Sequence, residues 1–444
     1  MTDYLLPVLP TSEIAAVTDR LADEQVRLLS GSVVDPAGVL RAKHVPAARA
    51  GEFHTAGMGA SPSWNVFCID NAIAFRPDFG VVGDLRLRAD LAALRVLGDG
   101  LAWAPAEMFG QDGVPSPVCT RGLLRRTQAE LESSGLTARV GAELEFTVAE
   151  RATGPWNAYG LGAVLDMEAF VGDVVDACAA AGRPVEQIHA EYGGGQFELS
   201  LAPDDALAAA DGVVLARMVV CRVARRYGLS VSFSPLPFAG GAGNGAHLHL
   251  SLHRDGRPLF SGGDGPHGLT AEGGAAIGGI VAGLADLVGV FSGSVLSPHR
   301  LQPGHWAGAF ACWGLENREA AVRLCAATLG NPHGASVELK CIDPSANPYL
   351  AAAALLGLAA DGLDRDLPLP QEVAVNPAEV PATVRLPEGQ AAVLAALEAS
   401  PLAERLLGPD IRGALLAVRH HELATYGDDD VAAVAERFRF TWSV

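Results

Sequence analysis

Residues 141–146 read GAELEF and place two carboxylates, Glu143 and Glu145, two positions apart. Side chains at this spacing point to the same face of a β-strand, so both glutamates are predicted to face away from Ala142 and Leu144. Two glutamates on a solvent-exposed strand edge are the commonest explanation of such a pair taken alone. The rest of the chain decides whether these two belong to a site.

Three further segments carry acids or imidazoles in apolar surroundings. They are EYGGGQFE with Glu191 and Glu198, GNGAHLHLSL with His247 and His249, and SVELK with Glu338. Five carboxylates cannot gather in one poorly solvated cleft as bare charges, because like charges there repel strongly. Bound cations remove the conflict, and oxygen-rich ligand sets suit Mg²⁺ or Mn²⁺ better than Zn²⁺. The sequence therefore predicts a metal-dependent enzyme.

Composition limits the function classes that remain. The chain has 444 residues, 49% of them hydrophobic, and a formal net charge of −19. This length predicts two or three domains with well-buried cores. The negative charge argues against nucleic acid and anionic membrane surfaces as partners and favours cationic substrates.

The chain is predicted to be cytoplasmic. Its seven cysteines are scattered without a C-x-x-C pair, which is typical of reduced thiols in a cytosolic protein. The N-terminal stretch MTDYLLPVLPTSE has no basic region followed by an apolar core, so no signal peptide is expected. The apolar stretch 273–293 is rich in glycine and contains Asp286, which predicts a packed core helix and no membrane span.

The order of elements predicts an α+β protein with domains at 1–110 and 111–444. A helix is expected from Thr11, then a hairpin of VRLLSGSVV and VLRAKHV joined by residues 35–38, then strands near 66–75 and 101–108. From residue 117, helical periodicity over 121–135, 167–182 and 204–228 alternates with strand-like segments, the last of them LSVSFSPLPF. All the candidate ligands are placed on strands, which predicts a large curved sheet with one face lining a site and helices on the other. Beyond residue 390 the chain is predicted to be helical again.

Other motifs have simpler interpretations. The glycines of 241–245 resemble a nucleotide-binding loop, but a strand-like segment follows them instead of a helix. His420, His421 and Glu422 lack H-E-x-x-H spacing and are interpreted as a solvated helix face. The guanidinium groups of Arg300, Arg318 and Arg323 suit carboxylate or phosphate, although surface salt bridges would explain them equally well.

Five motifs, in order over residues 141–355, resemble the glutamine synthetase family. GAELEF resembles G-x-E-x-E-F, EYGGGQFE resembles E…GQ-x-E, and GNGAHLHLSL resembles G-S-G-x-H-x-H-x-S-L. NREAAVRL resembles N-R-x-x-x-x-R, and VELKCIDPSANPYL resembles E-x-R-x-x-D-x-x-A-N-P-Y-L. The resemblance implies a small N-terminal β-grasp-like domain and a large catalytic domain with a curved antiparallel sheet. It also implies a homo-oligomer of stacked hexameric rings.

The resemblance also implies roles for individual residues. Two Mg²⁺ or Mn²⁺ ions per site would be held by Glu145, Glu191 and Glu198, and by Glu143, His247 and Glu338. His249, Ser251 and Arg323 would contact ATP, with Arg318 also on the phosphates, while Gly243, Arg300 and Lys340 would hold glutamate. Arg318 and Arg300 are the implied catalytic residues, stabilising charge as glutamate is converted to an acyl phosphate that an amine displaces.

The departures from the family pattern concern the amine and the nucleotide. Trp306 stands where ammonium-using members have a glutamate, and Met58-Gly59-Ala60-Ser61-Pro62 stands where they have F-D-G-S-S. Ammonium needs acceptors or negative charge to leave water, whereas an aromatic surface favours an alkyl or aryl amine. The pattern P-G-x-W-A…W-G-x-x-N-R resembles members that make γ-glutamyl amides from polyamines or other primary amines.

The expected function is therefore an ATP-dependent ligation of glutamate to a bulky or polycationic amine, with Trp306 as a substrate contact. Ordinary glutamine synthesis from ammonia and a non-catalytic ligand-binding relative are the alternatives. Leu236 and Ser336 stand where the family has a lysine and an arginine, and this predicts altered handling of ATP. Lys340 stands where the family has an arginine, and a lysine cannot bind a carboxylate in the bidentate geometry of a guanidinium group.

Overall fold

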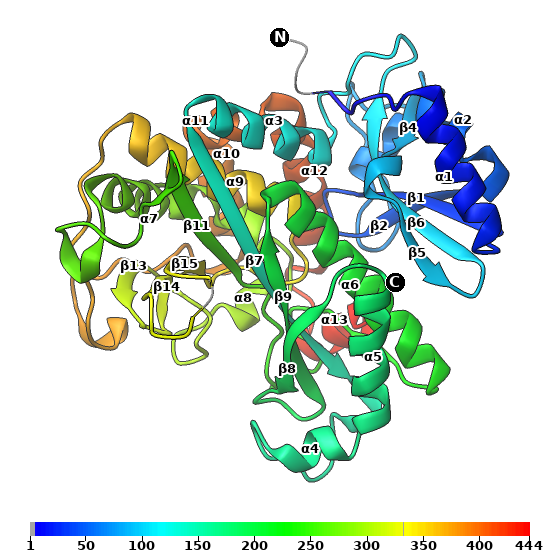
Figure 1. Cartoon of the computed structure of the whole chain (residues 1–444). Helices are drawn as coiled ribbons and strands as arrows, with labels where there is room; N and C mark the ends of the chain where they lie inside the picture. Colours follow the sequence, from blue (N-terminus) through cyan, green and yellow to red (C-terminus); the bar gives the residue numbers. More distant parts are fainter. Residues whose placement is uncertain (1–4, 332) are drawn as a thin grey trace.

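Two β-sheets organise the molecule in the computed structural model, which describes residues 5–331 and 333–444. The first four residues of the N-terminal stretch considered above lie outside the described residues. A six-stranded sheet has the order β2-β1-β6-β4-β3 with β5 paired to β6, and a nine-stranded sheet has the order β13-β14-β15-β11-β7-β9-β8 with β10 and β12 attached. The first sheet lies to one side of the larger one (Figure 1).

The N-terminal sheet follows most of the sequence-based expectations. Helix α1 (Thr11–Asp23) begins within the expected segment 11–14, and β1 (Leu28–Val34) forms the predicted antiparallel hairpin with β2 (Leu40–Pro46). Gly38 adopts φ +80° in the connecting turn, a conformation that favours glycine. The remaining elements of this part are α2 (Ala50–Thr55), β3 (Met58–Ala60), β4 (Leu85–Ala89), β5 (Arg95–Gly98) and β6 (Leu101–Phe109).

The strand expected near residues 66–75 is wrong. A short 3-10 helix occupies Pro62–Val66, and only an isolated bridge between Phe67 and Ile73 follows it. Asn71 has φ +66°, and the carboxylate of Asp70 accepts a hydrogen bond from the amide of Ala72 at 2.9 Å. These two residues make a tight turn in the middle of the apolar run, so no ladder extends through it.

The large sheet carries most of the candidate ligands. Its strands are β7 (Leu136–Val148), β8 (Val185–Ala190), β9 (Gln196–Asp204), β10 (Val231–Ser232), β11 (Leu248–Arg254), β12 (Arg257–Pro258), β13 (Phe310–Leu315), β14 (Ala320–Cys325) and β15 (Ser336–Leu339). All its pairings are antiparallel, as expected, except that β13 and β14 run parallel. The strand predicted over LSVSFSPLPF is confined to the two residues of β10, because Pro235 and Pro237 lack the amide hydrogen that a ladder needs.

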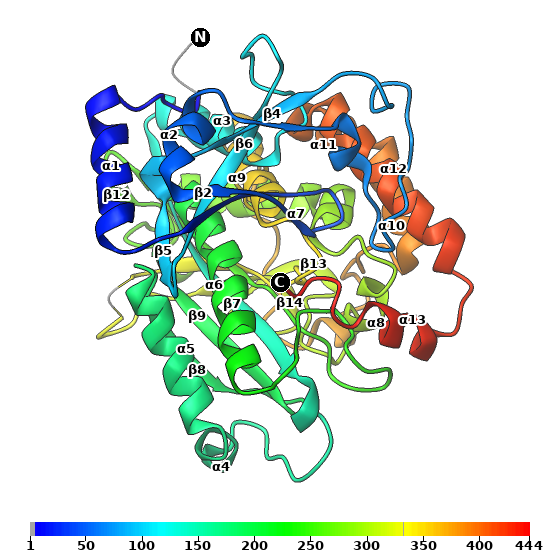
Figure 2. The same cartoon turned by 90° about the vertical axis from the view of Figure 1, so that its right-hand side faces the viewer.

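Helices cover one face of the large sheet, as predicted. Helix α6 (Ala206–Arg226) packs on β7 and β9, α3 (Thr120–Ser133) packs on β7, and α5 (Glu168–Ala180) packs on β8 and α6 (Figure 2). Leu144 on β7 is buried in this layer, whereas Glu143 and Glu145 on the same strand are only half-buried. The alternation in GAELEF thus places Leu144 in the core and Glu143 and Glu145 on the opposite face of the strand.

Helix α7 (Ala271–Phe291) corresponds to the core helix predicted over 273–293, although it ends two residues earlier. It is the one helix among residues 5–331 and 333–444 that is long and apolar enough to cross a membrane, and 78% of its most apolar window is buried within the protein. It packs against α9 (Pro348–Asp364), α10 (Gly389–Ala399) and the strands β13 and β14. The short helices α4 (Leu161–Leu165) and α8 (Ser297–Arg300) flank the sheet.

The C-terminal part is helical, as expected, but one of its motifs is not a solvated face. The helices are α10, α11 (Pro401–Leu407), α12 (Pro409–Tyr426) and α13 (Val431–Phe438). On α12, Glu422 is fully buried and accepts a hydrogen bond from Arg419 at 2.7 Å, while Nε2 of His421 lies 3.0 Å from Asp70. Of these three residues only His420 is exposed, because α12 packs against both α10 and the 3-10 helix Pro62–Val66.

The two parts of the chain are joined by buried polar contacts. The amide of Asn347 donates to the carbonyl oxygens of Val34 and Asp35, at 2.9 and 3.2 Å. Arg121 at the start of α3 contacts Asp90 and Glu107 of the first part and Asp211 on α6. The last strand of the first sheet ends at Phe109, and the division of the chain near residue 110 stays a prediction.

Candidate active site

Strand register brings the four segments together. Glu145 on β7 lies directly opposite Glu198 on β9, and His249 on β11 lies opposite Glu338 on β15. The amides of Glu143 and Glu145 each donate at 3.0 Å to the chain before β11, at the carbonyls of His247 and Gly245. Residues up to about 200 positions apart thus share one face of the sheet.

Glu143, His247 and Glu338 form the first group that could hold a metal ion. One ligand atom from each lies within 4.8 Å of the others. The Nδ1 atom of His247 is 3.3 Å from Glu143 Oε2 and 3.4 Å from Glu338 Oε1. These are the three residues that the family resemblance implies for one metal, and the structure brings them together.

Glu198 belongs to two further groups of this kind. One contains Glu145, Glu198 and His247, and the other contains His189, Glu191 and Glu198. The predicted set of Glu145, Glu191 and Glu198 is therefore split between two groups that share Glu198. The Nε2 atom of His189 lies 2.9 Å from Glu191 Oε1. His189 was not identified from the sequence, although it precedes Glu191 by two positions, the same spacing that links Glu143 and Glu145.

The expectation that every candidate ligand sits on a strand is wrong for two residues. Glu191 follows the end of β8, and His247 precedes the start of β11. The chain next to both is glycine-rich, and the amide of Gly245 donates to Glu145 Oε2 at 2.7 Å. A Cβ atom at residue 245 would lie 2.7 Å from His247 Nε2 and 3.0 Å from Glu145 Oε1, so only glycine lets the backbone approach this closely.

The charges at the site are unevenly compensated. Burial, together with repulsion from Glu143, Glu145 and the other nearby carboxylates, raises the pKa of Glu198 to about 10. Burial also raises the pKa of Glu143, but hydrogen bonds from His247 and His249 outweigh it and hold that pKa well below its usual range. For Glu338, burial is outweighed by Lys340 and the two histidines, which lower its pKa to about 2.

This donor set fits hard divalent cations. Carboxylate oxygens dominate it, and no arginine or lysine lies within ion-pair distance of Glu145 or Glu198 among the described residues. Mg²⁺ and Mn²⁺ prefer oxygen ligands, and a cation would replace the proton that Glu198 otherwise carries. Gln196 donates from Nε2 to Glu145 Oε2 at 2.9 Å and to the Gly243 carbonyl at 2.9 Å, which orients the carboxylate and the loop.

Three of the four predicted cationic residues contact this cluster. Arg300 is buried, and its Nη2 lies 3.2 Å from His247 Nε2, while its Nη1 is enclosed without a hydrogen-bond partner. Lys340 Nζ and Arg323 Nη1 donate to the two oxygens of Glu338 at 3.1 and 3.0 Å. Arg318 is exposed and forms no ion pair with any described residue.

The residues predicted to contact the nucleotide interact with neighbouring strands. His249 Nε2 lies 3.3 Å from Glu143 Oε1, and its Nδ1 lies 3.3 Å from the hydroxyl of Ser336. Burial lowers the pKa of His249, but hydrogen bonds and the charge of Glu143 outweigh this and raise it well above its usual value. Ser251 donates to the Ala335 carbonyl at 2.8 Å, and Leu236 is buried.

Trp306 occupies an exposed loop beside this face. Its side chain is 54% exposed, so it is not packed into the core, whereas Trp313 is fully buried and donates to the Pro370 carbonyl at 2.8 Å. The backbone amide of Trp306 donates to Glu319 Oε1 at 2.9 Å. Glu319 was not identified from the sequence, because it occupies a variable position within the N-R-x-x-x-x-R motif.

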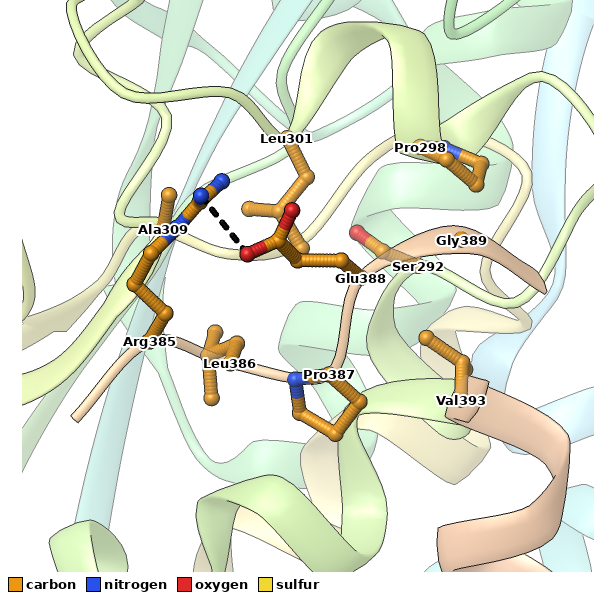
Figure 3. A pocket seen from close by; sticks show the side chains of 10 residues that line it. All are labelled: Ser292, Pro298, Leu301, Ala309, Arg385, Leu386, Pro387, Glu388, Gly389 and Val393. Carbon is orange, nitrogen blue, oxygen red and sulfur yellow. Dashed lines mark ion pairs between the residues drawn. The ribbon is translucent and has the colours of Figure 1, made fainter. Parts of the chain in front are cut away.

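A small cavity lies behind α8, the helix that ends at Arg300. Pro298 and Leu301 line it together with the segment around Arg385 and Glu388, whose side chains pair at 2.6 Å (Figure 3). Its volume is about 10 Å³, which is room for a single water at most. None of the acidic cluster lines it, so it is not the substrate site.

Comparison with known proteins agrees with this arrangement. The model of the glutamine synthetase catalytic domain matches residues 117–435. The γ-glutamylpolyamine synthetase of Streptomyces coelicolor is 38% identical over 96% of both chains, and the glutamine synthetase of Pyrococcus horikoshii is 36% identical over 58% of this chain and 59% of its own.

Solved structures give the same result for the whole fold. A crystal structure of a glutamine synthase homologue superposes with a TM-score of 0.87 at 31% identity, covering 94% of this chain and 98% of the other. The protein GmaS in complex with ADP superposes with a TM-score of 0.82 at 26% identity, covering 94% and 97%. The catalytic-domain match and the full-length relative establish that this chain belongs to the glutamine synthetase family.

Proposed function

We propose that the protein is an ATP-dependent ligase that joins the γ-carboxylate of glutamate to an amine through a γ-glutamyl phosphate. Membership of the glutamine synthetase family supports the reaction class, since its curated relatives are ligases. The observation that carries the proposal is the acidic face, where Glu145 and Glu198 have no arginine or lysine within ion-pair distance among the described residues. Three candidate ligand groups on this face are linked through Glu198 and His247. Such a face suits a reaction in which divalent cations and phosphates meet.

The acidic residues and His247 are proposed to hold two divalent ions. Glu145, Glu191 and Glu198 would hold one divalent ion, and Glu143, His247 and Glu338 the other. When bound, the ions supply neutralising charge for the phosphates of ATP and for the acceptor carboxylate. Mg²⁺ and Mn²⁺ both fit this donor set, and the proposal takes two ions per site.

The cationic side chains would act on the substrates. Arg300 has an enclosed, unpartnered Nη1 next to His247, which makes it a suitable donor to the carboxylate of glutamate. Lys340 and the backbone of Gly243 would complete that pocket. Arg318, exposed and free of ion pairs among the described residues, would stabilise charge on the transferring phosphoryl group, together with Arg323.

ATP would lie toward β11. His249 and Ser251 are the residues proposed to face the nucleotide, although both bond to neighbouring protein groups in this structure. Ser336 and Leu236 replace charged residues of the family pattern here. Because neither side chain can contact a phosphate as a cation, we expect weaker ATP binding than in members that keep those charges.

The amine is proposed to be a polyamine or another bulky primary amine. Trp306 replaces the glutamate with which ammonium-using members bind their small cation, and its indole is open to solvent. An exposed aromatic ring offers apolar and cation–π contact to an alkylammonium chain. The relative from Streptomyces coelicolor, aligned over nearly the whole chain, is a γ-glutamylpolyamine synthetase.

An amine panel tests the proposal directly. Purified protein with ATP, Mg²⁺ and glutamate should release phosphate in the presence of putrescine, spermidine or ethanolamine, and the product should carry the mass of the γ-glutamyl amide. Ammonium chloride serves as the control. If ammonium stimulates turnover as well as any primary amine does, the protein is an ordinary glutamine synthetase and the amine assignment is wrong.

A non-catalytic role is the remaining alternative, and it is favoured only by Leu236 and Ser336. Calorimetry with Mg²⁺ and ATP, followed by the same turnover assay, separates binding without reaction from catalysis. A homo-oligomer of stacked hexameric rings and a cytoplasmic location complete the proposal. Sedimentation velocity of the purified protein tests the first of these.

A further inference from the structure

Glu319 is a buried carboxylate whose charge has no partner. Its side chain is only 7% exposed, and no lysine, arginine or histidine lies within ion-pair distance of it among the described residues. Oε1 accepts the hydrogen bond from the Trp306 amide, but Oε2 is enclosed and accepts none. A buried carboxylate without compensation is costly, so we expect a cation to approach it in the working enzyme.

Glu319 contacts the Trp306 loop, where this chain departs from the pattern of ammonium-using members. The loop residue Trp306 lacks the carboxylate of ammonium-using members, yet the backbone nitrogen of this same residue is 2.9 Å from the carboxylate of Glu319. A carboxyl group is thus still present at the loop, supplied from the turn between β13 and β14 instead of from the loop side chain. This turn connects two strands of the large sheet, whereas the loop at residues 304–306 is exposed.

The same loop is connected to the acidic cluster. Gly308 has φ +75°, and a Cβ atom there would lie 2.9 Å from both Ala321 Cα and Lys340 Cβ. The amide of Lys340 donates to the Ala321 carbonyl at 3.0 Å, and its Nζ contacts Glu338. Glu319 lies directly before β14, and β14 pairs with β15, the strand that carries the candidate metal ligand Glu338.

Three residues of the loop have left-handed backbone conformations. Gly304 and Gly308 have φ values of +81° and +75°, and Trp306 between them has φ +52°, which is uncommon for a bulky side chain. The amide of Trp306 donates to Glu319, and among the described residues this is the one hydrogen bond between the Trp306 backbone and a side chain. An ammonium group is a stronger donor than an amide, so it can replace this contact and gain the enclosed oxygen as well.

We infer that Glu319 is the anionic anchor of the amine substrate, binding an alkylammonium group when the Trp306 loop lifts. The inference rests on the proposed function and adds the residue that recognises the cation. In this arrangement Trp306 contacts the carbon chain and Glu319 contacts the charge. The loss of the loop glutamate then excludes the small ammonium ion without removing the attraction for larger cations.

The test compares charged and uncharged nucleophiles. Glu319→Gln keeps an oxygen that can accept the Trp306 hydrogen bond and removes the charge. We expect the KM for putrescine to rise about 10- to 100-fold, as for loss of a charge-assisted hydrogen bond, with the KM values for glutamate and ATP changed less than about twofold. Hydroxylamine is uncharged at neutral pH, so formation of γ-glutamyl hydroxamate should be kept in the same variant.

Controls separate this role from a structural one. Glu398→Gln, on the exposed part of α10, should leave every parameter unchanged, and Glu319→Asp should restore part of the affinity for putrescine. If Glu319→Gln loses hydroxamate formation as strongly as it loses putrescine use, or leaves the KM for putrescine unchanged, the anchor is not Glu319. If the unsubstituted protein uses no amine better than ammonium, the proposed function fails first and the inference falls with it.

Discussion

Two buried clusters of carboxylates in this protein differ in how their charge is balanced. At the junction of the two sheets, Asp90, Glu107 and Asp211 each have an arginine within 2.9 Å, and Arg121 contacts all three. On the face of the large sheet, Glu145 and Glu198 have no arginine or lysine at ion-pair distance among the described residues. The first cluster is complete within the chain, whereas the second needs cations from solution.

The difference separates a structural joint from a reactive site. A buried ion-pair network stabilises a particular arrangement only if its partners are all present. Carboxylates that gather without partners are retained at the expense of stability, and this is the usual condition of a functional site. The comparison therefore predicts opposite responses when one member of each cluster is changed.

The largest effect is expected for Glu198→Gln. We expect activity to fall at least about 1,000-fold, because a ligand shared by two metal groups is lost. With the pKa of Glu198 raised to about 10, this side chain is protonated at neutral pH when no metal is bound, and a glutamine has nearly the same shape and charge. In the presence of a chelator, the variant should therefore unfold at the same temperature as the unsubstituted protein. Phosphate release and thermal unfolding measure the two properties, with Glu186→Gln on β8 as the control. A large loss of stability in the chelated protein would contradict the comparison.

Arg121→Met should have the opposite profile. Removing this arginine leaves Asp90 and Glu107 paired with Arg125, and Asp211 without an ion-pair partner among the described residues. Breaking a buried pair costs about 3–5 kcal/mol. Urea unfolding measures the change in the free energy of unfolding. Arg49→Met removes an exposed pair with Glu52 and should change stability by less than about 1 kcal/mol. Equal effects of the two substitutions would remove the distinction between the buried joint and a surface pair.

Adding Mg²⁺ to the chelated protein sharpens the same comparison. A ligand that binds only the folded state at 100 times its Kd stabilises that state by about 2.7 kcal/mol. We expect this gain in the unsubstituted protein and in Arg121→Met, and a much smaller gain in Glu198→Gln. Thermal unfolding with and without Mg²⁺ measures it, with NaCl of equal ionic strength as the control. The same gain in all three proteins would place the metal elsewhere.

The smallest effect is expected at Asp70, a carboxylate that accepts hydrogen bonds from His421 and Tyr426 and has no arginine or lysine within ion-pair distance among the described residues. Burial would raise its pKa, but hydrogen bonds from His421 and Tyr426 outweigh it and lower the pKa from 3.8 to about 2. A carboxyl group whose pKa is lower in the folded than in the unfolded protein stabilises the fold at pH values above its unfolded pKa of 3.8. This contribution is lost as the pH falls toward the folded pKa of about 2. Asp70→Asn should therefore cost about 1 kcal/mol at pH 7 and less at pH 3. A cost that grows on acidification would contradict this sign.

Local patterns in the sequence predicted the regular elements well. The helical periodicity of 204–228 corresponds to α6, and the turn residues 35–38 correctly joined β1 and β2. The strand near 66–75 failed, because the turn at Asp70 and Asn71 interrupts an apolar run that otherwise favours a strand. Short apolar runs are ambiguous for this reason.

Contacts between distant residues could not be derived from local patterns. Glu422 appeared to belong to a solvated helix face, yet packing of α12 buries it beside Arg419. His189 was missed although it has the same spacing of two to Glu191 that Glu143 has to Glu145, and Glu319 was missed because it occupies a variable position of the N-R-x-x-x-x-R motif. The proposed role of Glu319 rests on its hydrogen bond to the backbone of Trp306, 13 residues earlier in the chain. Only the folded loop brings these two residues into contact.

The sequence by itself determined the kinds of ligand, their alternation along strands and the order of motifs that places the chain in the glutamine synthetase family. Alternation is a local property, since successive side chains of a strand point to opposite faces whatever the strand pairs with. Tertiary structure alone decided which carboxylates share a ligand group and which are matched by arginines. Register and packing between segments far apart in the chain set those distances, and the free energy of a buried charge depends on what lies within a few ångströms of it.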